Sequence, residues 1–233
     1  QTQCLEYVIE RCHTEREELQ KWHAPKGTPG SNKLTEPSRC ALLGIPGAGK
    51  SLCLTLIRDF FENVLGWKHG VQFQFLASQN SMAASIGGNT VHSWGVIPTS
   101  KASALAKHAS KNVEWDQLFE NCISMRWIVI DEISTLSLAL LGTLELFLRT
   151  KACTTHPYAF QDTLRRRQAR MLGGLNLCTA GDLWQLGPVR DNPLFSHPMR
   201  KTDGTRYEAG EQRMLAMFLG MEQTRFLQWH PTV

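Results

Sequence analysis

The stretch Gly44-Ile45-Pro46-Gly47-Ala48-Gly49-Lys50-Ser51 fits the phosphate-binding pattern G-x-x-x-x-G-K-[ST]. Its three glycines permit backbone dihedrals that are closed to other residues and bring backbone N–H groups close to an anion. Successive N–H groups around such a turn form a concave nest for phosphate oxygens. Lys50 is suited to hold an ammonium against the β- and γ-phosphates, and Ser51 to offer a hydroxyl to Mg²⁺. The sequence therefore predicts a nucleoside triphosphate site made of Gly44, Pro46, Gly47, Ala48, Gly49, Lys50 and Ser51.

The residues on either side of this loop fit a strand before it and a helix after it. Cys40–Leu43 is a short apolar run, as expected of a buried parallel strand. A helix N-terminus after the loop adds partial positive charge at the phosphates. After the loop, apolar residues recur at helical spacing and predict one apolar face, made of Leu52, Leu56, Ile57, Phe60 and Val64.

The composition is that of an ordinary globular protein. The 233 residues suffice for one substantial domain or two small ones, and the formal charge of +4 permits a nucleic-acid partner without requiring one. Seven cysteines without a C-x-x-C pair are typical of reduced thiols and favour an intracellular protein. No signal-peptide pattern is apparent, and the apolar stretch Leu136–Leu148 is too short and too broken to span a bilayer, so we expect no membrane partner.

The first 38 residues are expected to lie outside the nucleotide-binding unit. Residues 1–22 predict a helix with one apolar side, packed on the main body or on a partner, and this side is made of Leu5, Val8, Ile9, Cys12, Leu19 and Trp22. Residues 24–37 are rich in Pro and Gly and are typical of a linker or surface loop. We therefore expect an N-terminal helix and linker over residues 1–38 and a single domain over residues 39–233.

Three further runs predict the remaining strands of the sheet: Val71–Leu76, in which apolar residues alternate with glutamines, Trp127–Ile130 and Leu175–Ala180. Trp127–Ile130 is apolar throughout, which indicates a central strand. Helical patterns separate the runs, among them a helix over residues 99–112 and a long apolar helix ending at Leu148. The alternation of strand and helix predicts an α/β protein, with a parallel sheet covered by helices on both faces.

Polar residues follow these strands at the edge where a parallel sheet binds ligands. Four apolar residues and then Asp131-Glu132 form a Walker B pattern, in which Asp131 is suited to hold Mg²⁺. Glu132 is suited to accept a proton from the attacking water or to orient it. Helix capping is the alternative for these acids, because acids and Ser134 favour helix N-termini. Gln185, after the last run, is suited to sense a γ-phosphate or to position water, and a core or surface role is the alternative for this residue. With the phosphate loop upstream of these acids, we expect an ATPase that uses ATP and Mg²⁺.

Two basic groups allow either a solvated surface or a contact with nucleic-acid phosphates, and the sequence leaves both alternatives open. The first group lies on the helix over residues 99–112, and the second lies in the segment before the last apolar run. Their members are Lys101, Lys107 and Lys111, and Arg165, Arg166, Arg167 and Arg170.

Four segments of the chain resemble, in order, motifs I, Ia, II and III of the Pif-type ATP-dependent DNA helicases, which are RecD-like members of helicase superfamily one. These segments are Gly44–Ser51, Ser85–Trp94, Ile130–Ser134 and Gly181–Val189. The strings I-G-G-x-T-x-H-S and G-D-x-x-Q-L-x-P-V within them are far more specific than the phosphate loop alone. The resemblance covers residues 39 to 195 and extends to the helicases of Helitron transposons.

The resemblance implies a RecA-like P-loop NTPase fold. It also implies ATP hydrolysis in a cleft between two RecA-like domains, coupled to movement along single-stranded DNA and to duplex unwinding. By the same resemblance, Lys50 and Ser51 bind the phosphates and Mg²⁺. Asp131 and Glu132 hold the metal and activate water, and Gln185 contacts the γ-phosphate.

The resemblance further implies that the motif Ia segment lies along the DNA strand. Its contacting residues would be Thr90, His92, Ser93 and Trp94. The Trp94 ring is suited to stack on a base, and core packing is the alternative for this ring.

The chain departs from the family pattern at Gln79-Asn80, where a Thr-Gly pair is usual, and at Gly187, where a second proline is usual. The second RecA-like domain, which carries an arginine finger in the family, is expected in a full-length parent. We expect a nuclear or mitochondrial protein. Two other functions stay open: a P-loop kinase acting on a small molecule, and a catalytically silent, transposon-derived module that binds nucleotide or DNA.

Overall fold

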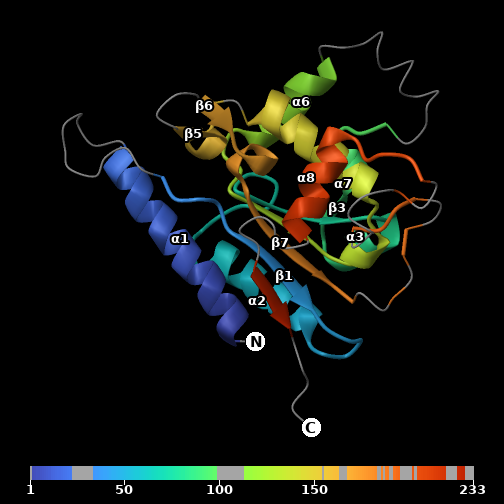
Figure 1. Ribbon diagram of the computed structural model, residues 1–233. Helices are drawn as coiled ribbons and strands as arrows, with labels where there is room; N and C mark the ends of the chain where they lie inside the picture. Colours follow the sequence, from blue (N-terminus) through green and yellow to red (C-terminus); the bar gives the residue numbers. More distant parts are fainter. Residues whose placement is uncertain are drawn as a thin grey trace.

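The computed structural model describes residues 2–22, 34–98, 113–153, 155–162, 167–182, 185, 187–188, 191–194, 201, 204–218 and 225–228 (Figure 1). A six-stranded sheet in the order β3-β2-β4-β7-β1-β8 forms the centre of the molecule. Every neighbouring pair of strands in this sheet is parallel. Parallel strands need crossover connections, which cover both faces of the sheet with helices. The predicted α/β fold is therefore confirmed.

The strands of this sheet are β1 (Arg39–Leu43), β2 (Phe73–Ala77), β3 (Asn89–Thr90), β4 (Trp127–Ile130), β7 (Asn176–Gly181) and β8 (Arg225–Gln228). A separate antiparallel pair consists of β5 (Phe160–Asp162) and β6 (Arg167–Ala169). The α-helices are α1 (Thr2–Trp22), α2 (Lys50–Asp59), α3 (Asn80–Ser85), α4 (Val91–Trp94), α6 (Val113–Cys122), α7 (Leu138–Phe147) and α8 (Ala209–Phe218). Short 3-10 or π-helical turns are η1 (Phe60–Val64), η2 (Ile133–Thr135), η3 (Leu148–Ala152), η4 (Pro157–Ala159) and η5 (Met171–Gly174). Among the described residues, no helix combines the length and the apolar character needed to cross a bilayer.

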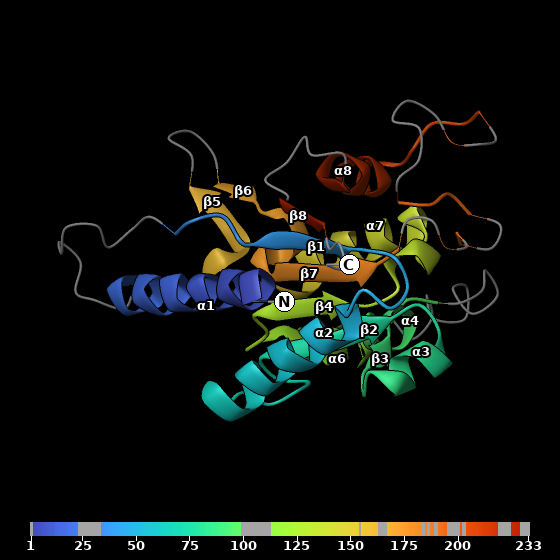
Figure 2. The ribbon, with the colours of Figure 1, turned by 90° about the horizontal axis from the view of Figure 1, so that it is seen from below.

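Side chains of the central strands alternate between two buried clusters, because successive strand residues point to opposite faces of the sheet. On β4, Trp127 and Val129 join the cluster that α1 and α2 cover, whereas Ile128 and Ile130 join the cluster that α6, α7 and α8 cover. Figure 2 shows β1, β7, β4 and β2 side by side between these layers. Burial on both faces explains why the sequence of β4 is apolar throughout.

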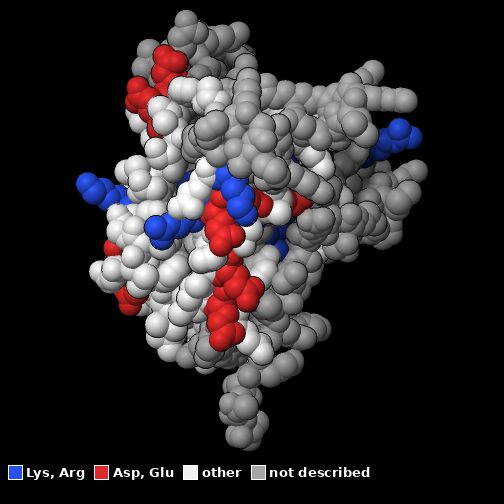
Figure 3. Space-filling view, turned by 90° about the vertical axis from the view of Figure 1, so that its left-hand side faces the viewer, with Lys and Arg blue, Asp and Glu red and all other residues white. Residues whose placement is uncertain are grey.

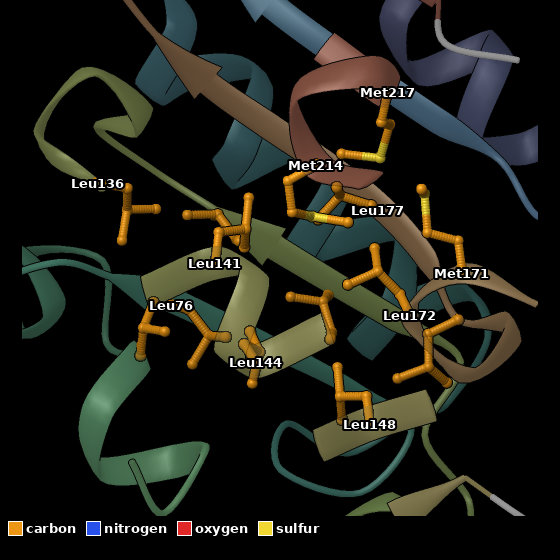
Figure 4. Close-up of a cluster of buried hydrophobic side chains, with 14 of the residues drawn as sticks. Leu76, Leu136, Leu141, Leu144, Leu148, Met171, Leu172, Leu177, Met214 and Met217 are labelled. Carbon is orange, nitrogen blue, oxygen red and sulfur yellow. The ribbon is translucent and has the colours of Figure 1, made fainter. Parts of the chain in front are cut away.

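The second cluster fixes α7 and α8 against the sheet. Leu141 from α7, Leu177 from β7 and Met214 from α8 gather in it (Figure 4). The two helices approach closely where Gly210 meets Gly142, because a Cβ on Gly210 would lie 2.6 Å from the Gly142 carbonyl oxygen. Only residues without side chains permit this spacing.

The predicted N-terminal helix is confirmed as α1, and it packs on the main body. Val8 and Cys12, from its predicted apolar side, are buried against the sheet and α2. Ile9 and Trp22 were expected on the same side but are each 38% exposed. The packed side is therefore narrower than the sequence predicts.

The apolar face predicted for the helix after the loop is only partly right. Ile57 is buried as expected, but Leu52 is 49% exposed and Val64 is 71% exposed. The helix instead buries Cys53 and Leu54 beside Ile57. Both sets have helical spacing, so periodicity alone could not choose between them. The position of the loop at the sheet edge sets which face turns inward.

The second strand begins at Phe73, two residues later than predicted, because the N–H of Gly70 donates to the carbonyl oxygen of Phe73 at 2.8 Å and closes a turn there.

For Arg170, both predicted alternatives, a solvated surface and a phosphate contact, are wrong. It is buried, pairs with Glu36 at 3.2 Å and donates to the Leu34 carbonyl oxygen at 2.8 Å, so it is neither solvated nor free to contact a phosphate.

The helix expected over residues 99–112, with its three lysines, lies outside the described residues, as do Arg165 and Arg166. Arg167 begins β6.

Candidate functional site

The three segments predicted to bind nucleotide come together at the carboxyl edge of the sheet. β4, β7 and β1 are neighbours, so the residues that follow them are neighbours as well. The N–H of Gly44, after β1, donates to the carbonyl oxygen of Gly181, at the end of β7, at 3.2 Å. The N–H of Asp131, after β4, donates to the carbonyl oxygen of Leu76 at 3.0 Å. These bonds extend the strand pairing into the loops and fix their mutual positions.

The glycine loop has the backbone that its sequence predicts. Gly47 and Gly49 have φ angles of +80° and +86°, in the region that favours glycine. The N–H of Ala48 donates to the carbonyl oxygen of Ile45 at 3.2 Å and closes the turn above Pro46. The loop therefore has the tight, left-handed geometry from which anion nests are built.

Lys50 and Ser51 open α2, directly after the loop. The ammonium of Lys50 donates to the carbonyl oxygens of Gly44 and Ile45, at 2.7 and 3.0 Å, so it lies over the loop itself. Ser51 is exposed in the first turn of the helix. The ammonium and the positive end of the helix dipole therefore meet at one point, which favours an anion there.

The two acids of the Walker B pattern lie after β4, close to Lys50. Oδ1 of Asp131 accepts the N–H of Glu132 at 2.9 Å. Burial raises the pKa of Asp131, and the Glu132 N–H and the Lys50 ammonium oppose this shift. Burial and then the Asp131 carboxylate raise the pKa of Glu132, again opposed by Lys50. A raised pKa makes Glu132 a stronger base than a free carboxylate.

The backbone of Glu132 is unusual for a residue with a side chain. Its φ and ψ angles are 51° and 50°, in the left-handed region. Such conformations cost energy and concentrate at functional sites. Glu132 also precedes the 3-10 turn η2 without a side-chain capping bond, so the capping alternative lacks support at this residue.

Asp182 and Gln185 follow β7 at the same edge. The carboxylate of Asp182 contributes to the raised pKa of Glu132, which brings a third acid to the site. The N–H of Gln185 donates to the carbonyl oxygen of Asp182 at 3.2 Å, and the residue is exposed. Gln185 therefore belongs to the turn that follows β7, next to Asp182.

The donor set fits Mg²⁺ bound together with a nucleotide. Within the described ranges, no three or more His, Cys, Asp or Glu residues are grouped to hold a metal by themselves. Mg²⁺ in phosphate sites is commonly held by one or two carboxylates or hydroxyls plus the phosphates and water. The Asp131 carboxylate and the Ser51 hydroxyl are oxygen donors of this kind, at the same edge as the loop.

The motif Ia segment forms β3 and the short helix α4. Oγ1 of Thr90 accepts the N–H of Ser93 at 3.1 Å and caps α4, so this hydroxyl has a structural partner. Nδ1 of His92 lies 3.3 Å from the carbonyl oxygen of Ile97, and Ser93 is exposed. Trp94 is only 6% exposed and packs in the second core cluster. Its burial corrects the expected stacking on a base and favours the core-packing alternative.

The two glycines of this segment are required by close contact. A Cβ on Gly88 would lie 2.3 Å from the carbonyl oxygen of Phe75 in β2, and Gly87 has a φ angle of +57°. Arg58 of α2 holds the same turn, since it donates to the carbonyl oxygen of Ile86 at 2.5 Å and lies over the Phe75 ring at 4.4 Å. The helix that begins at the nucleotide loop thus contacts the turn before Thr90.

A groove of about 580 Å³ lies beside the nucleotide edge. It runs between the ends of β2 and β4, the start of α7 and the segment after β7. Its walls are mostly small, polar or hydroxyl-bearing, and its lining residues are Ser78, Gln79, His92, Ile97, Pro98, Thr135, Ser137, Ala139, Leu140, Thr143, Pro188 and Asp191.

Two groove residues that no sequence motif had indicated are Ser78 and Thr135, whose Oγ atoms lie 2.5 Å apart. Both residues follow strands, β2 and β4, at the edge where ligands bind. This position was the signal that could have identified them.

A model of the PIF1-like helicase family matches residues 34–202 of the chain, a range that includes the loop, the motif Ia segment and both acids. The chain belongs to the PIF1-like helicase family.

The PIF1-like chain is similar to known helicases over part of their length. The ATP-dependent DNA helicase PIF1 of Saccharomyces cerevisiae (strain YJM789) is 30% identical over 152 residues, which is 64% of this chain and 15% of that protein. A crystal structure of Pif1 helicase from Candida albicans matches with a TM-score of 0.53 and 21% identity, over 97% of this chain and 39% of that one. This second match establishes the fold. A structure of Pif1 helicase from Bacteroides in complex with ADP-AlF3 and ssDNA has a TM-score of 0.48 and 19% identity, over 85% of this chain and 39% of that one.

Proposed function

We propose that this chain is a motor domain of a PIF1-like ATP-dependent DNA helicase, which hydrolyses ATP and uses the energy to move along single-stranded DNA and unwind duplexes. The observation that carries this proposal is the meeting of Lys50 with Asp131 and Glu132 at one sheet edge, next to a polar groove. A nucleotide and a strand of DNA would then occupy neighbouring sites.

The residues at the nucleotide edge have distinct roles in the proposed reaction. Loop N–H groups and the Lys50 ammonium bind the phosphates, and Ser51 and Asp131 hold Mg²⁺. When bound by these two residues, Mg²⁺ would supply positive charge beside the transferring phosphoryl group. Glu132 orients the attacking water and takes its proton, and its raised pKa suits it to this task. Gln185, beside Asp182, contacts the γ-phosphate.

Single-stranded DNA would lie in the groove, along the segment that contains Thr90, His92 and Ser93. Groove hydroxyls and the imidazole of His92 are hydrogen-bonding groups for phosphates and base edges. The opposite side of the molecule is unsuited to DNA, because acidic side chains run down the face that contains α1 (Figure 3). The exposed acids of α1 include Glu6, Glu10 and Glu17.

A second RecA-like domain is part of this proposal. The chain spans 15% of the S. cerevisiae relative and 39% of the C. albicans structure that it matches, and helicases of this class close a nucleotide between two domains. All seven cysteines are free thiols, which is consistent with a reducing compartment, and we assign the protein to the nucleus or the mitochondrion.

The test is ATP hydrolysis by the 233-residue chain with and without an oligodeoxythymidylate. We expect Mg²⁺-dependent hydrolysis that the single strand stimulates, and Lys50→Ala should weaken ATP binding at least tenfold. A small-molecule kinase would not respond to DNA, and a silent module would bind without turnover. Unchanged ATP affinity in Lys50→Ala would contradict the assignment of the loop.

A further inference from the structure

Two hydroxyls join the groove to the turn that carries Glu132. Ser78 follows β2 and Thr135 ends η2, and their Oγ atoms lie 2.5 Å apart. Both residues line the groove. Oγ1 of Thr135 also donates to the carbonyl oxygen of Glu132 at 2.8 Å. A continuous hydrogen-bonded path therefore runs from the groove surface to the backbone of Glu132, the proposed general base.

The direction of these bonds follows from counting protons. A hydroxyl has one proton to donate, and a carbonyl oxygen can only accept. The Thr135 proton is used on the carbonyl oxygen of Glu132, so Ser78 must be the donor in the Ser78–Thr135 bond. The other acceptor near Ser78 is the sulfur of Met82 at 3.7 Å, which is a weak acceptor.

Thr135 supports a backbone that is costly to hold. Glu132 is in the left-handed region, and Thr135 donates twice to its carbonyl oxygen, from the backbone N–H at 3.0 Å and from Oγ1 at 2.8 Å. Such conformations persist only where surrounding contacts over-determine them. A change in the hydrogen bonds that Thr135 makes therefore alters how firmly the left-handed backbone of Glu132 is held.

We propose that Ser78 and Thr135 are positioning residues that couple occupancy of the groove to the geometry of Glu132, an inference that rests on the proposed function. A phosphate or base oxygen in the groove is an acceptor that competes with Thr135 for the single Ser78 proton. When Ser78 turns to this ligand, Thr135 loses its donor and rearranges with the turn that holds Glu132. DNA binding and nucleotide binding thereby alter one another.

The coupling is measured at equilibrium, without turnover. The affinity of the full chain for a labelled oligodeoxythymidylate is determined with and without Mg·ATPγS, and the ratio of the two Kd values is the coupling factor. Reciprocal coupling of this kind is typically about 5- to 150-fold. Thr135→Val removes the hydroxyl at nearly constant shape and should bring the factor close to one. Thr135→Ser keeps the hydroxyl and should restore the wild-type coupling factor. If Thr135 acted only through the packing of its methyl group, Thr135→Ser would not restore the factor.

Ser78→Ala gives an independent arm, because it leaves the Thr135–Glu132 bond in place. It should also lower the factor, and the double variant with Thr135→Val should lower it no further. Thr14→Val is the matched control, since Thr14 likewise donates to a carbonyl oxygen of its own helix, that of Glu10 at 2.8 Å, but lies on α1 and does not line the groove. It should keep the wild-type factor.

The outcomes separate this inference from the proposed function. Wild-type protein that binds both ligands with a factor of one, or Thr135→Val with the wild-type factor, overturns the coupling and leaves the proposed function standing. Wild-type protein that binds neither ATPγS nor the oligonucleotide overturns the proposed function itself.

Discussion

Glu15 of α1 and Arg126, the residue before β4, form a buried ion pair with 2.6 Å between Oε2 and Nη2. Glu15 is 3% exposed and also accepts from Arg11 at 2.9 Å and from Asn176 at 2.7 Å. One carboxylate thus joins α1 to the amino-terminal ends of β4 and β7. The helix is held at the edge of the sheet opposite to the nucleotide loop.

Glu15→Ala should destabilise the fold severely, because it leaves the guanidinium groups of Arg11 and Arg126 buried without their carboxylate. Breaking one partner of a buried pair costs about 3–5 kcal/mol. Glu17→Ala is the matched control on the same helix. Among the described residues its carboxylate pairs with His13 alone, in an exposed contact, and such surface changes stay within about 0.5 kcal/mol. Urea denaturation of both variants measures the difference, and equal losses would contradict the role of the network.

His156 should make stability depend on pH. Burial, together with the Arg126 guanidinium, lowers the pKa of His156 to about 3 in the folded chain. The pKa of an unfolded histidine is about 6.5. Between these two pKa values the unfolded state binds more protons than the folded state. The free energy of unfolding is therefore highest above about pH 6.5 and decreases as the pH falls toward about 3.

The measurement is urea denaturation at several pH values between 7 and 4. In the wild type, the Tyr158 N–H donates to Nδ1 of His156 at 3.2 Å. His156→Asn keeps an acceptor for this N–H and removes the titrating ring. Its pH dependence should be shallower than that of the wild type by up to about 1.4 kcal/mol per pH unit. Superimposable pH profiles would show that the ring does not contribute.

Gly88→Ala should destabilise the motif Ia turn. The new Cβ would lie 2.3 Å from the Phe75 carbonyl oxygen, so β2 or the turn must move. Overpacking of this kind typically costs about 1–3 kcal/mol. Gly187→Ala is the control, because no atom of the described residues lies within 4 Å of its Cβ position, and its stability should stay within about 0.5 kcal/mol of the wild type. Thermal or urea unfolding compares the two, and a neutral Gly88→Ala would contradict the packing argument.

The fold and the nucleotide edge could be predicted because their signals are local. The loop glycines and the four apolar residues of β4 each specify one short backbone conformation, and the structure has both. Asp131 and Glu132 could be assigned to the same edge from topology alone, since both follow a parallel strand.

The buried face of α2, the environment of Trp94 and the Ser78–Thr135 bond could not be predicted, because they depend on contacts between distant segments. Leu52 and Cys53 both fit an apolar helix face, and only the packing of α2 on the sheet decides that Cys53 is buried. Trp94 is equally suited to a base or to a core until its neighbours are known. The Ser78–Thr135 bond joins residues 57 positions apart in the sequence, which no periodicity reveals.

Glu132→Gln should separate nucleotide binding from hydrolysis. The amide keeps the size of the side chain but cannot take a proton from water, and loss of a general base typically costs about 10²–10⁴ in rate. The loop and Lys50 are untouched, so ATP affinity should change by less than about threefold, well below the roughly 1.4 kcal/mol of a tenfold change. Phosphate release under single-turnover conditions and titration with a fluorescent nucleotide measure the two quantities. Wild-type hydrolysis in this variant would exclude Glu132 as the base and leave Asp131 and Asp182 as the remaining acids at this edge.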